Sequence, residues 1–174
     1  MPLPDSDTQT GRPQPNPRRD AGWNVTVVPA ERPDHIAAML VPYLAELGVP
    51  ADYPYLNLYW SDDARHAYEF LVGDARAGFA LVRQQEGTFE MAEFYVAPEW
   101  RRHRIGRSAA TSVLAAHPGA WEVHSFPGSA AAERFWETVL TGGERRVEGG
   151  RPVFRLHVAP KPAGLGYPCH QIAW

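Results

Sequence analysis

Four arginines fall in a short turn between a strand-like segment and a helix-like one. The strand-like run 89–96 ends at Ala97-Pro98, and apolar residues recur at helical spacing from Ile105 onward. Backbone N–H groups at the start of a helix are unpaired and the helix dipole adds positive charge, so such a turn can hold a pyrophosphate. The arginines would add ionic contacts: Arg101, Arg102, Arg104 and Arg107. A solvated basic face is the alternative interpretation.

The turn matches neither of the common nucleotide-binding motifs. A P-loop needs a glycine-rich run closed by Lys and Ser or Thr, and a dinucleotide fingerprint needs three spaced glycines. The chain has a formal net charge of −3 and an isoelectric point of about 6.1, which gives no global attraction to nucleic acid or to anionic membranes. An anion site must therefore be local. A nucleic-acid binder built on the arginine cluster stays open as an alternative, although no recognisable module supports it.

The run 94–107, F-Y-V-A-P-E-W-R-R-H-R-I-G-R, resembles motif A of the GNAT superfamily of N-acetyltransferases, which runs strand, V-x-P, aromatic, R-x-x-G-x-G, helix. In that family the free edge of the strand pairs with pantetheine, and the amides of the turn hold the pyrophosphate of coenzyme A. The resemblance implies pantetheine contacts at Phe94, Tyr95 and Val96. It implies pyrophosphate contacts from the whole turn: Arg101, Arg102, His103, Arg104, Ile105, Gly106 and Arg107.

One position departs from the family pattern. Arg104 stands where the family usually has its first glycine, which leaves Gly106 as the only glycine of the signature. Glycine would let the backbone approach a phosphate closely, so Arg104 either blocks that approach or adds a cation. We expect the added cation, because an amide can still donate from right-handed α geometry.

The run 125–136, S-F-P-G-S-A-A-A-E-R-F-W, is similar to motif B of the same family, a strand followed by N-x-x-A and an aromatic pair on a helix. The resemblance implies cofactor contacts at Ser129, in the asparagine position, and at Ala132, the small residue that lets the cofactor arm pass. Trp136 occupies the position where many members place a tyrosine near the thiol. The same spacing also fits an ordinary core helix, and the distance after motif A favours the family interpretation.

Acyl transfer from a thioester to an amine needs a base for the amine and a proton for the leaving thiolate. Glu90 falls where many family members place an acidic residue, and Glu93 is the alternate base. Alternation along a regular strand would send these two side chains to opposite faces, so at most one should face the cleft. Either carboxylate could equally be an ordinary surface or paired group.

The acid is harder to assign, because the indole N–H of Trp136 does not titrate in a useful range. Three residues could replace the tyrosine: Tyr95, His124 and Ser125. We favour His124, which lies on the strand facing the expected thioester channel and has a suitable intrinsic pKa. A structural histidine, with solvent as the proton source, is the alternative.

An aromatic segment at 49–66 sits where the family's substrate-covering segment usually lies. Aromatic side chains with nearby acids could receive a cationic amine. The candidate substrate contacts are Tyr55, Tyr59 and Trp60. These residues could instead cap the core.

The elements that position these residues follow from apolar periodicity and turn signals. We expect strands at 24–28, 67–72, 77–84, 89–96, 120–126 and 152–158, and helices over 36–47, from 105 and from 129. Pro42 should kink or split the first helix. This order favours an α/β sandwich with a mixed sheet. The resemblance implies the GNAT fold, a mixed, mostly antiparallel central sheet of six to seven strands flanked by about four helices.

The 174 residues suit one domain. We expect a disordered Pro-rich leader at 1–21, the acyltransferase domain at 22–158, and a tail at 159–174 that packs on the domain. Cys169 is the only cysteine, so no intrachain disulfide or cysteine-rich zinc site can form, and a reducing cytoplasm fits. No signal sequence or membrane span is recognisable.

Together these patterns predict a cytoplasmic acyl-CoA dependent N-acyltransferase that uses acetyl-CoA or another acyl-CoA. It would transfer acetyl to a primary amine by direct attack in a ternary complex, as a monomer or homodimer, with no metal, nucleic acid or membrane partner. The alternative is a non-catalytic acyl-CoA binding module, because Arg104 and Trp136 both depart from the family pattern.

Overall fold

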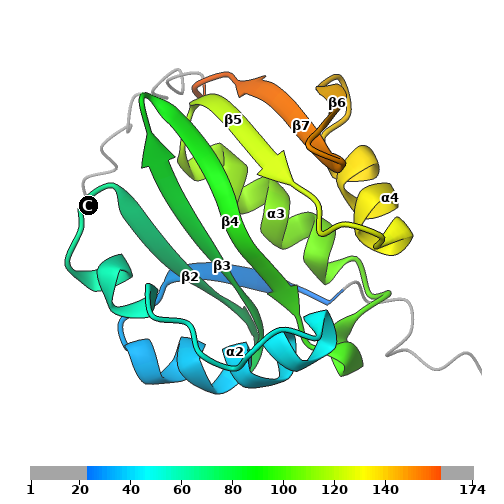
Figure 1. Ribbon diagram of the computed structural model, residues 1–174. Helices are drawn as coiled ribbons and strands as arrows, with labels where there is room; N and C mark the ends of the chain where they lie inside the picture. The colour runs from blue at the N-terminus through cyan, green and yellow to red at the C-terminus, as the bar shows by residue number, and fades with distance from the viewer. Residues whose placement is uncertain (1–22, 162–174) are drawn as a thin grey trace, which may run out of the picture.

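A computed structural model describes residues 23–161 of the chain. Seven strands form one sheet in the order β1-β2-β3-β4-β5-β7-β6 (Figure 1). The strands are β1 (Val25–Pro29), β2 (Arg65–Val72), β3 (Ala75–Gln85), β4 (Thr88–Val96), β5 (Gly119–His124), β6 (Glu144–Glu148) and β7 (Arg151–Val158). The helices are α2 (Pro33–Leu47), α3 (Ile105–Ala116) and α4 (Ala130–Val139), with short 3-10 turns η1 (Leu56–Trp60) and η2 (Pro98–Trp100).

The sheet confirms the predicted mixed, mostly antiparallel arrangement. All neighbouring strands pair antiparallel except β4 and β5, which run parallel. Residues 23–161 form three α-helices and two short 3-10 turns, whereas about four helices were expected. No helix within the described range is long and apolar enough to cross a bilayer.

Helix α2 runs unbroken, so the expected division at Pro42 does not occur. Pro42 lies on the exposed side of the helix, whereas the buried side chains Ile36, Leu40 and Leu44 hold the other side against the sheet. Burial of that apolar stripe offsets the hydrogen bond that the proline removes. The helix ends at Gly48, whose φ of 67° is the left-handed conformation typical of a helix C-terminus.

Two apolar layers cover the two faces of the sheet (Figure 1). On one face, α2 and η1 pack on Phe79, Leu81 and Tyr95. On the other face, α3 and α4 pack on a larger cluster that includes Phe70, Met91 and Trp121. The sheet therefore separates two surfaces. A cavity can connect them only where neighbouring strands diverge.

The sheet opens between β4 and β5. The parallel pairing covers only Thr88–Met91 against Ala120–Val123, while β4 continues to Val96. The two ribbons diverge beyond that point in Figure 1. The second half of β4 therefore has a free backbone edge inside the molecule.

Candidate active site

A cavity of about 490 Å³ lies at this opening, between β4, the turn that follows it, α4 and the C-terminal end of α2. Most of the predicted cofactor residues line it: Phe94, Tyr95, Val96, Arg101, Arg102, Arg104, Gly106, Arg107, Ser129, Ala132 and Trp136. Two predicted residues do not. Ile105 is 1% exposed in the core, and the ring of His103 packs against Trp23.

The free edge of β4 presents unpaired backbone groups to this cavity. The N–H of Ala97 donates to the carbonyl of Ala77 on β3 over 2.9 Å. Because successive residues of a strand direct their backbone groups to opposite sides, Phe94 and Val96 direct theirs away from β3, into the opening. An extended amide-containing ligand can pair with such an edge as an added strand does.

Arg101 is already engaged at this edge. Its Nε donates to the carbonyl oxygen of Val96 over 2.7 Å, and its Nη2 donates to both carboxylate oxygens of Glu46 over 2.7 and 3.0 Å. The guanidinium also lies over the ring of Tyr95, 5.6 Å from its centre. Arg101 therefore ties the turn to α2. Three other arginines are exposed and pair with no carboxylate within residues 23–161: Arg102, Arg104 and Arg107.

Arg104 has a different backbone conformation from the one expected. It is the N-cap residue of α3 with a φ of 63°, and Arg102 has a φ of 68°. The expectation of right-handed geometry at Arg104 is therefore wrong, because the chain keeps the left-handed conformation that a glycine would adopt there. For a residue with a side chain this conformation costs about 1–2 kcal/mol. Strain of this kind persists where the surrounding structure over-determines it, often at ligand-binding turns.

Close packing at the start of α3 explains the one glycine that the turn retains. A Cβ atom on Gly106 would lie 3.3 Å from the ring of Phe135 and 3.4 Å from Val96. On α4, the hydroxyl of Ser129 accepts a hydrogen bond from the N–H of Ala132 over 3.3 Å, and so caps the helix. Trp136 lines the cavity while its ring packs edge-on against Phe94, 5.2 Å between centres.

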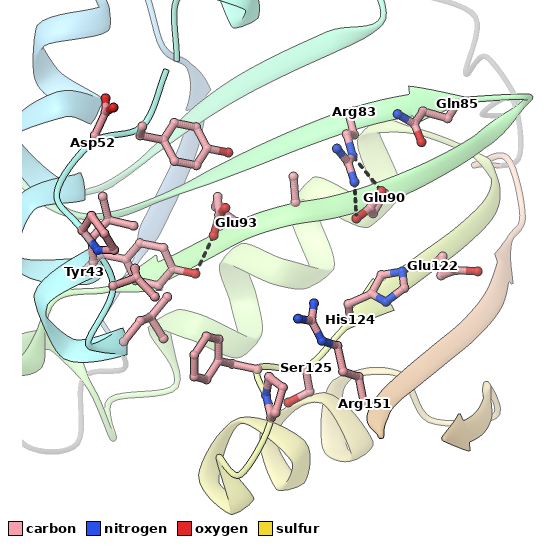
Figure 2. Close-up of a pocket in the computed structure, with 18 residues that line it drawn as sticks. Tyr43, Asp52, Arg83, Gln85, Glu90, Glu93, Glu122, His124, Ser125 and Arg151 are labelled. Carbon is pink, nitrogen blue, oxygen red and sulfur yellow. Dashed lines mark hydrogen bonds and ion pairs between the residues drawn. The ribbon is translucent and has the colours of Figure 1, made fainter. Parts of the chain in front are cut away.

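A second cavity, of about 890 Å³, opens on the α2 face of the sheet (Figure 2). Its walls come from α2 and the loop after it, β3, β4, β5 and the start of β7. Tyr43 and Leu47 of α2 line both cavities. The two cavities therefore meet at the C-terminal half of α2, next to the free edge of β4.

Both candidate bases face this second cavity. Val82 of β3 pairs with Met91 and Leu81 pairs with Glu93, so Ala92 is an extra residue in β4. Such a β-bulge shifts the side-chain alternation by one position. The expectation that Glu90 and Glu93 point to opposite faces is therefore wrong, and Figure 2 shows both on the cavity side of the strand.

The surroundings of the two carboxylates differ. Glu90 is held by Arg83 in a two-point ion pair, 2.7 Å from Nε and 2.9 Å from Nη2. Glu93 accepts a hydrogen bond from the hydroxyl of Tyr43 over 2.6 Å. Burial raises the pKa of Glu93 above its ordinary value, although hydrogen bonds from Tyr43 and Tyr53 and the charge of Arg83 act in the opposite direction. Glu93 therefore gains a proton more readily than an exposed carboxylate does.

The three candidate acids lie away from the meeting point of the cavities or are enclosed. His124 lines the second cavity only, and its Nε2 lies 2.6 Å from Oε1 of Glu122. Tyr95 is buried between Tyr43 and Phe79, with ring centres 5.5 and 5.8 Å away. The side chain of Ser125 is enclosed as well.

The predicted substrate residues line neither cavity. Tyr59 is buried, and Nε1 of Trp60 donates to the carbonyl of Ala30 over 2.8 Å, so both cap the core. Tyr55 is 58% exposed on the outside of the same segment. Tyr53 lines the second cavity instead. Tyr43 was not anticipated either, since its helical spacing with apolar neighbours indicates only a core position.

Comparisons with known proteins agree with this geometry. A family model described as the acetyltransferase (GNAT) family matches residues 33–140. The chain is similar to an acetyltransferase from Thermus thermophilus, with a TM-score of 0.64 and 15% identity over 79% of this chain and 99% of that one. It is similar to a putative GNAT acetyltransferase from Desulfovibrio desulfuricans, with a TM-score of 0.58 and 19% identity over 78% and 100% of the two chains.

A third similar structure is the PaiA N-acetyltransferase from Thermoplasma acidophilum in complex with coenzyme A. Its TM-score is 0.59, with 8% identity over 77% of this chain and 99% of that one. No curated protein matches the sequence. The family model spans more than half of the chain, so the protein belongs to the GNAT acetyltransferase family, whose members bind acetyl-CoA.

Proposed function

We propose that this protein is an N-acyltransferase that transfers acetyl from acetyl-CoA to a primary amine by direct attack in a ternary complex. One observation carries the proposal. The cavity beside the free edge of β4 meets a second cavity at Tyr43, and the carboxylate of Glu93 lies 2.6 Å from that tyrosine's hydroxyl. A thioester reaching the meeting point from one side would face an amine entering from the other.

The residues of the first cavity fit the cofactor. The free backbone groups of Phe94 and the N–H of Val96, whose carbonyl already accepts from Arg101, suit the amides of a pantetheine arm. The start of α3 offers unpaired N–H groups. The unpaired arginines suit phosphates: Arg102, Arg104 and Arg107. Acetyl-CoA, when bound, supplies an acyl group activated as a thioester.

Glu93 is the base in this proposal, in preference to Glu90. A base must be able to gain a proton at the working pH, and burial moves the pKa of Glu93 upward, in that direction. Glu90 instead gives both of its oxygens to the guanidinium of Arg83. Glu90 would therefore fix Arg83 in the wall of the cavity.

Tyr43 is the group we assign to the proton of the leaving thiolate, in the place of the tyrosine that Trp136 replaces. It lines both cavities, and its hydroxyl already contacts Glu93. Burial, and then the charge of Glu93, raise the pKa of Tyr43, so a free tyrosinate is disfavoured. Tyr43 would release its proton only as it receives one from Glu93, and so act as a relay.

Calorimetric titration of acetyl-CoA tests the cofactor site. Wild-type protein should show saturable binding that a double variant, Arg102→Ala with Arg107→Ala, weakens strongly. The control removes two arginines outside both cavities, Arg134→Ala with Arg146→Ala, and should bind as the wild type does. Thiol release with a panel of primary amines then tests transfer. Binding without turnover on any amine would leave a non-catalytic acyl-CoA binding module.

A further inference from the structure

Besides Glu93, the second cavity has two charged groups that form no ion pair within residues 23–161. Two of its carboxylates are closed in ion pairs: Glu90 with Arg83, and Glu122 with Arg155 and His124. Asp52 and Arg151 also line the cavity, and neither forms an ion pair within residues 23–161. Figure 2 shows Asp52 on the same side as Tyr43 and Glu93, and Arg151 across the cavity beside Ser125.

Arg151 is placed there by the pairing of β5 with β7. The N–H of Ser125 donates to the carbonyl of Pro152 over 3.0 Å, which holds the first residues of β7 against the end of β5. Figure 2 shows the guanidinium of Arg151 directed toward the space between β5 and β4. A guanidinium with no internal partner at a cavity wall is suited to a ligand carboxylate, which it can hold at two points.

A second observation at the same place is the hydroxyl of Ser125. This side chain is 2% exposed, and its Oγ has no hydrogen-bond partner in the described part of the chain. Buried hydroxyls are normally paired, so an unpaired one beside a ligand pocket needs an explanation. An oxygen of a ligand held by Arg151, which lines the same cavity, would be a partner for this hydroxyl.

Two loops contribute apolar side chains to the wall of the cavity. Val49 and Pro50 come from the loop after α2, and Phe126 and Pro127 come from the loop after β5. Val49 is 37% exposed and Phe126 is 43% exposed, among the few large apolar side chains of the described residues that face solvent. Apolar side chains in the wall of an otherwise polar cavity favour a ligand that carries an apolar group.

We propose that the acceptor is an amine that also carries a carboxylate and an apolar group, the chemistry of an apolar amino acid or a short peptide. The inference rests on the function proposed above. The amine would lie at Glu93, the carboxylate on Arg151, and the apolar group against Val49 and Phe126.

The transfer balances with these groups. The acceptor enters as an ammonium ion and first loses one proton to solvent. Its nitrogen then forms an amide bond with the acyl carbon as the carbon–sulfur bond breaks. The second proton leaves the nitrogen for Glu93, and one proton reaches the thiolate through Tyr43. The ion pair between the acceptor carboxylate and Arg151 takes no part in these steps and only positions the amine.

Matched probes test the carboxylate directly. Thiol release from acetyl-CoA is measured with L-phenylalanine and L-phenylalaninamide, and with glycyl-L-phenylalanine and its amide, which separates amino acids from peptides. In at least one of the two pairs, we expect kcat/KM to be about 10- to 100-fold higher for the probe with a free carboxylate than for its amide. This ratio is the effect of one charge-assisted hydrogen bond. Arg151→Gln should remove that preference and leave the amide member unchanged. Arg146→Gln, a change on the neighbouring strand outside the cavity, is the control.

Equal use of the two members of each pair, or equal losses for both in Arg151→Gln, would overturn the inference. Turnover of simple amines without turnover of any of the four probes would also overturn the inference, but it would leave the proposed function intact. If no amine is acetylated, the proposed function fails. The acceptor site is then tested by calorimetric titration of the four probes in the presence of coenzyme A. Carboxylate-dependent binding that Arg151→Gln removes would still support the site, and its absence would overturn it.

Discussion

The hydroxyl of Tyr43 on α2 donates a hydrogen bond of 2.6 Å to Oε2 of Glu93 on β4. The two residues are 50 positions apart, and the contact crosses from one layer of the molecule to the sheet. It lies where the two cavities meet, because Tyr43 lines both of them. The base and the proton relay of the proposed reaction are therefore in direct contact. Substituting each residue in turn measures its own contribution.

Replacing the base should nearly abolish turnover. Glu93→Gln keeps the shape and removes the proton acceptor, so we expect kcat to fall by about 100- to 10,000-fold with acetyl-CoA binding unchanged. In the wild type, activity should increase as pH rises through the pKa of Glu93, which burial places above its ordinary value, and should be lost below it. The measurement is kcat against pH.

Glu90→Gln is the matched control for this change. Its partner Arg83 loses an ion pair, so some loss of activity is expected. The charge of Glu90 raises the pKa of Glu93, so the acidic limb of the pH profile should persist and move to lower pH. An acidic limb that disappears in Glu90→Gln and persists in Glu93→Gln would reverse the assignment of the base.

The relay predicts a specific shift for Tyr43→Phe. The hydroxyl of Tyr43 lowers the pKa of Glu93 by donating to its charged form, so removing that hydroxyl should raise this pKa further. We expect the acidic limb of the kcat profile to move to higher pH, together with a lower plateau. Tyr55→Phe, which removes an exposed hydroxyl outside both cavities, should change neither. An unmoved limb with an unchanged plateau would mean that the hydroxyl of Tyr43 takes no part in proton transfer.

Two substitutions at Arg104 separate backbone strain from charge. Arg104→Gly should raise the free energy of unfolding by about 0.5–1 kcal/mol, because relief of the left-handed conformation exceeds the entropy that glycine loses. Arg104→Ala keeps the strained φ and should show no such gain. Both variants lose the cation, so both should bind acetyl-CoA about fivefold more weakly, the size of one exposed ionic contact. Urea unfolding and calorimetric titration measure the two quantities, and equal stabilities would show that the turn is unstrained.

His117 should make stability depend on pH. Burial, and then the charge of His66, lower the pKa of His117 from 6.5 to about 4 in the folded protein. Its Nε2 lies 2.7 Å from the hydroxyl of Tyr68. Between these two pKa values the unfolded chain binds a proton that the folded chain does not, so stability should fall as pH decreases from about 6.5 to 4. Above that range both states are neutral at this site and no effect is expected.

The measurement is urea unfolding at several pH values in this range. His117→Gln should flatten the dependence, and His157→Gln, a change at an exposed position on β7, should leave it as in the wild type. An equally steep decline in His117→Gln would assign the effect to other groups.

The sequence alone determined the local elements and most of the residues that line the first cavity. Alternating apolar residues mark β4, and apolar residues at helical spacing mark α3 and α4. The turn from β4 to α3 is one continuous stretch of sequence, so the cavity beside Val96 and Gly106 follows from local structure. The edge strand β6 escaped prediction because all five of its residues are exposed and show no apolar alternation. It is held by pairing with β7, which is not a local property.

The tertiary structure alone decided which groups line the second cavity together. The bulge at Ala92 depends on how β4 pairs with β3, and it brings Glu93 to the face that regular alternation assigns to Glu90. Tyr43, Arg101 and Arg151 acquire their contacts from elements far away in the chain, and nothing in their own segments indicates those contacts. Local spacing fixes which side of its own strand or helix a residue takes, whereas register and packing between distant segments fix what it meets there.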